Sequence, residues 1–171
     1  MVVLQHQRII RETVAEAMRK SADPALDLVF LHLPVPHDPF FYDARTGQDA
    51  VHPDPVMGYL DHLELGDRVL GQIRRAMNES GVAAWTTLVV SSDHWNRMAD
   101  QLDGKMDHRV PFLVNFPVST RGLQYAPPFN TILTRSFITA IMNREIRTPQ
   151  EAAQWLDRTN GALTDSPYNR N

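Results

Sequence analysis

The residues best suited to chemistry in this sequence are Asp93 and His94, which directly follow the run at residues 86–92. Threonines, leucine and valines make up the run, which ends in two serines, as is typical of a buried parallel strand delivering polar groups at its carboxyl end. Zinc and similar divalent ions accept carboxylate and imidazole ligands, whereas calcium or magnesium would favour the carboxylate. Adjacent strand residues point to opposite faces, so both side chains reach one ion only where the strand has ended. The sequence therefore predicts a divalent-metal site here, the alternative being a helix-capping Asp93 beside a surface His94.

The elements that would position this pair are a strand, a helix and a second strand. Residues 26–33 are almost continuously apolar and predict a buried strand, and residues 58–78 carry a helical stripe that Gly81 ends. With the strand ending at Asp93, this order predicts a right-handed βαβ unit with parallel strands. The proline-rich excursion at residues 34–55 would leave the carboxyl end of the first strand, where active sites gather in open α/β sheets. The helical stripe consists of Tyr59, Leu63, Gly66, Leu70, Ile73 and Met77.

Further elements surround this unit. Asn130 or Thr131 could cap a helix whose inner face carries apolar residues. The order of Thr148, Pro149 and Glu151 is the signature of a capping box at the start of another helix. Further predictions are a helix at residues 2 to about 20, a polar loop at 95–109, an edge strand at 110–117, and an inner face made of Ile132, Leu133, Phe137, Ile138 and Ile141.

Composition limits the classes of function. The chain has 171 residues, 43% of them hydrophobic and 22% charged, which is typical of a soluble globular protein. A net charge of −3 without a basic run gives no footprint for nucleic acid, so we expect no nucleic-acid partner. The absence of cysteine excludes disulfides, thiolate ligands and a cysteine nucleophile. No apolar run approaches the roughly 20 residues that cross a bilayer, so we expect no membrane segment in this chain.

Four stretches, in this order, resemble the C-terminal portion of the sulfatase family within the alkaline phosphatase superfamily, and bacterial sulfatase-like hydrolases most of all. The stretches are His32-Leu-Pro-Val-Pro-His37-Asp-Pro-Phe, Tyr59-Leu-Asp61 through Asp67-Arg-Val-Leu-Gly71, Thr87-Leu-Val-Val-Ser-Ser-Asp93-His94 and Arg109-Val-Pro-Phe-Leu-Val. The resemblance implies an α/β fold with a mainly parallel sheet and helices on both faces, from which the N-terminal part is missing. We therefore expect a single partial domain over residues 1–171, with a core at about 1–157 and a loose tail at 158–171.

The resemblance also assigns roles to individual residues. It implies that Asp93 and His94 bind a divalent metal ion, which could be calcium, magnesium, manganese or zinc. By the same resemblance, His37 contacts the sulfate or phosphate ester, and Lys105 is the candidate for a lysine that contacts the same group. His32 is either a core or second-shell histidine or a functional one, and the alternatives for His108 are a further zinc ligand and an exposed loop residue. We expect Asp93, His94 and His37 to converge at the carboxyl edge of the strands.

This chain departs from the family pattern at two points. Trp95 stands where family members usually have glycine after the Asp-His pair. The segment with the nucleophile and further metal-binding aspartates has no counterpart, so we expect no nucleophile in this chain. The predicted function is metal-dependent hydrolysis of a small sulfate or phosphate ester, with pairing to a missing N-terminal half; the alternative is a truncated noncatalytic domain with at most a weak metal site. A soluble domain of a membrane-attached bacterial protein fits the resemblance, and surface positions are predicted for His6, His52 and His62.

Overall fold

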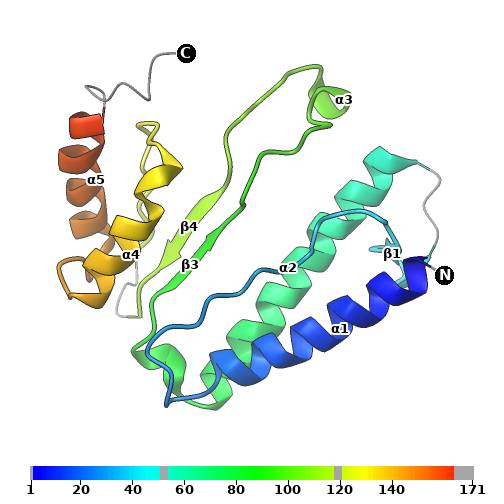
Figure 1. Ribbon diagram of the computed structural model, residues 1–171, viewed down its shortest axis with the longest axis horizontal. Coiled ribbons are helices and arrows are strands. Elements are labelled where there is room, and N and C mark those ends of the chain that lie inside the picture. The colour runs from blue at the N-terminus through cyan, green and yellow to red at the C-terminus, as the bar shows by residue number, and fades with distance from the viewer. Residues whose placement is uncertain (1, 51–53, 118–120, 164–171) are drawn as a thin grey trace. The chain divides into compact units, whose positions relative to one another are not determined.

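The computed structural model describes residues 2–50, 54–117 and 121–163 (Figure 1). The chain divides into two compact units, which are treated separately below. The first unit consists of Met1–Ala84 with Ser92–Val110, and the second of Trp85–Ser91 with Pro111–Asn171. All of the predicted site residues belong to the first unit.

Two long helices form the framework of the first unit. Helix α1 (Val2–Ser21) confirms the helix predicted at residues 2 to about 20 and packs against helix α2 (Pro55–Glu79). The start of α2 is fixed by Asp54, whose Oδ1 accepts the N–H of Val56 at 2.9 Å, with a proline in the first turn. Gly81 has a φ of 82° directly after the helix, in the C-terminal role predicted for it.

The buried face of α2 differs from the predicted stripe. Ile73 and Met77 are buried as predicted, but Leu63 is 44% exposed. His62, for which a surface position was predicted, is fully buried, so that prediction is wrong. The reason is the glycine one turn earlier, Gly58, which lets the chain at Phe40 pack directly on this face. The buried residues of α2 are Gly58, His62, Val69, Ile73 and Met77.

Residues 26–33 form no strand, so the prediction of a buried strand there is wrong. Leu31 and Leu33 pack against the core between α1 and α2, whereas Leu28 and Phe30 point outward and are 57% and 85% exposed. Packed and exposed side chains alternate along this segment as they do along a strand, but none of the strands in the described residues pairs with it. Because both faces carry apolar side chains, the sequence pattern resembles a strand buried on both sides.

The excursion after residue 33 is anchored to both helices. It contains a short antiparallel hairpin, β1 (Tyr42–Asp43) with β2 (Gln48–Asp49). Phe41 and Tyr42 are buried in a cluster with Ile10 of α1, and an ion pair joins Arg11 Nη2 to Asp49 Oδ2 at 2.5 Å. The segment predicted to be irregular from its prolines therefore contains a hairpin and buried residues that pack on the helices. The unit also contains η1 (Val82–Ala84) and α3 (Asp100–Asp103).

The second unit contains an antiparallel strand pair, which overturns the predicted fold class. Strand β3 (Leu88–Ser91) pairs with β4 (Phe112–Asn115), with Leu88 opposite Asn115 and Ser91 opposite Phe112. The described residues therefore form two short two-stranded antiparallel sheets, not a mainly parallel sheet with helices on both faces. The two apolar runs are joined by one loop, so the returning chain pairs antiparallel without the crossover that parallel strands require. The strand predicted at residues 110–117 is confirmed.

The remaining elements of this unit are helices. Asn130 Oδ1 accepts the N–H of Ile132 at 3.0 Å and starts η2 (Thr131–Leu133), which leads into α4 (Thr134–Met142). Leu133 and Phe137 are buried as predicted, but Ile132 is 68% exposed, so its predicted inward position is wrong. The core consists of Phe116, Phe137, Ala140, Ile146, Ala152 and Leu156.

The predicted capping box is confirmed at the start of α5 (Pro149–Leu163). The N–H of Glu151 donates to Thr148 Oγ1 at 3.2 Å, and the N–H of Thr148 donates to Glu151 Oε2 at 3.1 Å. Residues 158–163 of the predicted tail belong to this helix, and residues 164–171 lie outside the described residues.

Candidate metal and ester site

Asp93 and His94 lie in a bend just after the end of β3, where the regular backbone has stopped. Ser92 Oγ donates to the backbone carbonyl of His94 at 2.7 Å and closes this bend. On a strand, adjacent side chains point to opposite faces, and in a bend this rule does not apply. The local backbone is therefore of the kind that the sequence predicted for a shared metal site.

The structure brings His32 close to Asp93. Nε2 of His32 lies 3.9 Å from Oδ2 of Asp93, and the two side chains are 75% and 66% exposed. Two donors bound tetrahedrally at roughly 2.1 Å from one zinc ion lie about 3.4 Å apart. The separation is thus close to that of two ligands of one ion. Of the alternatives for His32, a core position is excluded by its exposure.

The histidine of the Asp-His pair has a defined ring orientation. His94 Nδ1 lies 2.7 Å from the backbone carbonyl of Trp95. Because a carbonyl only accepts, Nδ1 carries the hydrogen, and Nε2 is left with its lone pair. A ring held in this way by a backbone carbonyl presents Nε2 to a metal ion.

His37 has the same kind of support from its neighbour. Its Nδ1 lies 2.7 Å from the backbone carbonyl of Asp38 and 2.8 Å from the Asp38 carboxylate. Both partners accept, so Nδ1 donates to them. Within the described residues no hydrogen bond or ion pair joins His37 to Asp93 or His94. The expected convergence of these three residues stays a prediction.

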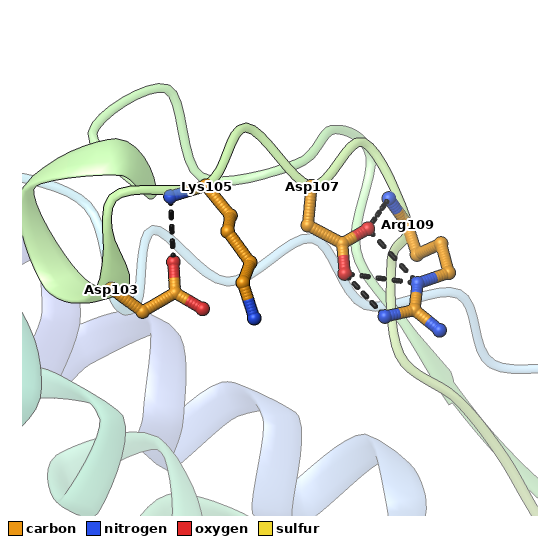
Figure 2. A network of polar contacts seen from close by, with 4 residues as sticks. All are labelled: Asp103, Lys105, Asp107 and Arg109. Carbon is orange, nitrogen blue, oxygen red and sulfur yellow. Dashed lines mark hydrogen bonds and ion pairs between the residues drawn. The ribbon is translucent and has the colours of Figure 1, made fainter.

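Lys105 and its neighbours form a separate polar network on the loop before β4 (Figure 2). The backbone N–H of Lys105 donates to Asp103 Oδ1 at 3.0 Å, and the lysine side chain runs beside the Asp103 carboxylate (Figure 2). The Arg109 guanidinium donates to Asp107, which lowers the pKa of that carboxyl to about 2. Lys105 is exposed, and its contact with an ester stays a prediction.

His108 stacks on Trp95, the residue that directly follows the Asp-His pair. The ring centroids lie 4.5 Å apart at an interplanar angle of 29°. This contact joins the two arms of the loop at residues 92–110, next to Asp93 and His94. His108 is exposed, which agrees with the second of its two predicted alternatives, an exposed loop residue. Its ring is stacked on Trp95.

His62 is a residue of this unit that the sequence interpretation missed. Its Nε2 accepts the N–H of Phe41 at 2.9 Å, and its ring is in edge-to-face contact with Phe40 and Phe41. The sequence held one signal: His62 lies one turn after Gly58, and a glycine within a helix often marks a close approach by another segment. From apolar periodicity alone, Leu63 was predicted to be buried, whereas the buried residue is its neighbour His62.

The donor set fits only part of a metal site. Asp93, His94 and His32 offer oxygen and nitrogen ligands of the kinds that divalent ions accept. However, no group of three or more His, Asp or Glu side chains in the described residues lies close enough together to hold a metal ion. A structural zinc site has four ligands, and a catalytic one usually has three from protein. A site here therefore needs a rearrangement of His94 or ligands from another segment.

Comparison of the chain with known protein families, with curated proteins and with solved structures found no match. Among the described helices, none combines the length and the apolar character that crossing a membrane requires.

Proposed function

We propose that this chain contributes a divalent-metal and ester-binding segment to the hydrolysis of sulfate esters or related phosphate esters. The observation that carries the proposal is the approach of His32 Nε2 to Asp93 Oδ2 at 3.9 Å, from segments far apart in the sequence. In this proposal Asp93 binds the ion together with His94 or His32. The metal, when bound, offsets negative charge on the ester oxygens.

The chain's own residues supply positioning and charge. His37, with Nδ1 held by Asp38, presents Nε2 to an ester oxygen. Lys105 supplies a mobile cation for the same group. The nucleophile comes from a second polypeptide segment, because no residue here matches the family's nucleophile. Such pairing leaves the substrate's alcohol group to be recognised largely by that segment.

A noncatalytic domain with at most a weak metal site is the second candidate. It is favoured by the exposure of the two closest donors, since their side chains are 75% and 66% exposed. Exposed ligands in water bind a cation more weakly than ligands enclosed in a site of low dielectric. If the chain is a noncatalytic domain, it should bind metal without hydrolysing an ester, even when a second polypeptide segment is added.

A titration with manganese, followed by backbone amide NMR, tests the metal site. The paramagnetic ion should broaden the resonances of residues around His32, Asp93 and His94 before any others. Asp93→Ala should abolish this local broadening, and Asp100→Ala, which removes another exposed carboxylate of the same loop, should leave it unchanged. Broadening that is equal at all exposed carboxylates would contradict the site.

Turnover separates the two candidates. The chain is supplied with magnesium, calcium, manganese or zinc and assayed on an aryl sulfate and an aryl phosphate, alone and with the proteins that co-purify with it. Hydrolysis that is lost in both His37→Ala and Asp93→Ala assigns the activity to this site. Hydrolysis that is unchanged in both variants rules out the assignment, and metal binding without hydrolysis under any of these conditions favours the noncatalytic domain.

A further inference from the structure

A buried hydrogen bond fixes the protonation state of one histidine outside the candidate site. His62 is fully buried on α2, and its Nε2 accepts the backbone N–H of Phe41 at 2.9 Å. A backbone amide only donates, so Nε2 in this contact carries no hydrogen and the ring is neutral. The bond therefore exists only in the uncharged form of the imidazole.

This bond lies at the centre of the contact between α2 and the segment at residues 34–50. The His62 ring is in edge-to-face contact with Phe40 at 5.1 Å and with Phe41 at 4.9 Å. A Cβ at Gly58 would lie only 2.7 Å from the Phe40 side chain, so the segment sits flush against the helix. The His62 ring has no exposed surface in this contact.

We propose that His62 is a pH-sensitive latch, which holds the segment at residues 34–50 on α2 when neutral and releases it when protonated. A proton on Nε2 would place one donor against another and would remove the acceptor for Phe41 N–H. It would also place positive charge on a fully buried ring, and burial opposes the charged form of an imidazole. Release frees the segment that carries His37.

Other charged groups around this contact do not replace His62 as the trigger. The Asp43 carboxylate accepts the N–H of Thr46, which lowers the pKa of Asp43, and the Asp49 carboxylate is in an ion pair with Arg11. Burial raises the pKa of Tyr59, which stays neutral there. Among the described residues, the packed elements also carry Asp61, Glu64, Asp67 and Arg68 on α2, His37, Asp38 and Arg45 on the segment, and His6, Arg8 and Glu12 on α1.

His6 is the histidine that the experiment must separate from His62. Its ring lies 5.9 Å from that of Phe41, on the α1 side. Unlike His62, it accepts no hydrogen bond from the segment among the described residues. A His6→Gln variant therefore removes a titrating group near Phe41 but keeps the latch, and His62→Gln keeps an acceptor, the amide oxygen, that does not titrate.

Amide hydrogen exchange of Phe41, corrected for the intrinsic effect of pH, tests the latch. In the unaltered chain the protection of Phe41 should fall at least tenfold between pH 7.5 and pH 5.5. His6→Gln should show the same fall, and His62→Gln should show none. Equal protection at both pH values in the unaltered chain, or the same fall in His62→Gln, overturns the proposal.

A second measurement keeps the test decisive if His62→Gln does not fold. The ring nitrogen shifts of His62 in the unaltered chain should report an unprotonated Nε2 at pH 7.5. Protonation of that ring and loss of Phe41 protection should share one midpoint. Separate midpoints, or a ring that is already protonated on Nε2 at pH 7.5, overturn the proposal.

Discussion

His32 Nε2 lies 3.9 Å from Asp93 Oδ2, although neither residue belongs to a helix or a strand. Neighbouring residues position both: Leu31 and Leu33 pack on the α1–α2 core on either side of His32, and Ser92 bonds to the carbonyl of His94 and so closes the bend at Asp93. The pair is thus positioned at both ends by local contacts while its side chains stay open to solvent. An exposed contact of this kind adds little stability of its own. In the proposed function the two side chains are ligands of one metal ion.

Metal binding should depend on both members of this pair. His32→Ala and Asp93→Ala should each weaken manganese binding by about tenfold, which corresponds to ~1.4 kcal/mol. Because the two side chains would share one ion, the double variant should lose less than the sum of the single losses. Calorimetric titration of the four proteins measures this coupling. Fully additive losses would mean that the two residues bind separate ions.

The helices of this protein follow from its sequence to a large degree. The charged and apolar spacing before Ser21, Asp54 with the proline after it, and the Thr148–Glu151 pair are local signals, and each acts within one or two turns of chain. Local hydrogen bonds satisfy such signals whatever the rest of the fold does. For this reason the helix predictions at both ends of the chain are confirmed.

The sheet could not be predicted in the same way, because strand pairing is not a local property. The runs at 26–33 and 88–91 both have the composition of buried strands, but nothing in either run specifies its partner. Assuming a parallel partner for both gave the wrong fold class, and Leu28 and Phe30 lie exposed instead. Strand β3 ends at Ser91, two residues before the end predicted at Asp93, so Asp93 and His94 still follow a strand directly, and a metal site there stays a prediction.

Two glycines of α2 offer a matched test of the close contact with Phe40. Gly58→Ala should destabilise the protein by about 1–3 kcal/mol, because the new Cβ would lie 2.7 Å from the Phe40 side chain. Gly71→Ala should stabilise it by about 0.5–1 kcal/mol, since nothing lies within 4 Å and alanine is the better helix former. Urea unfolding of both variants checks the opposite signs. A stabilising Gly58→Ala would mean that the segment at residues 34–50 does not sit flush on α2.

The Trp95–His108 stack should hold the two arms of the 92–110 loop together. Trp95→Gly, which introduces the residue usual in the resembled family, removes the 4.5 Å stack. Amide exchange at residues 92–99 should then accelerate, while global stability changes by only about 0.5–1.5 kcal/mol, the typical value of an aromatic pair. His108→Ala should reproduce the local acceleration. If only Trp95→Gly has an effect, the backbone freedom of glycine, and not the stack, is responsible.

The Asp107 carboxyl should titrate well below its ordinary range because the Arg109 guanidinium donates to it (Figure 2). Its pKa is lowered from 3.8 to about 2, so the folded form binds its proton at lower pH than the unfolded form. The resulting contribution to stability is complete above about 3.8 and is lost as the pH falls through about 2. Since both side chains are exposed, salt should weaken the effect. Side-chain carbon NMR of Asp107 measures the titration directly.

Arg109→Gln should return the pKa of Asp107 toward 3.8, because it removes the charge and the paired donors. Lys105→Gln serves as the matched control: the lysine contacts the network through its backbone N–H to Asp103, so its side-chain charge is not part of the Asp107 contact. The pKa of Asp107 should therefore stay near 2 in Lys105→Gln. If both variants raise it equally, general positive charge on the loop, and not the paired hydrogen bonds from Arg109, holds the carboxylate ionised.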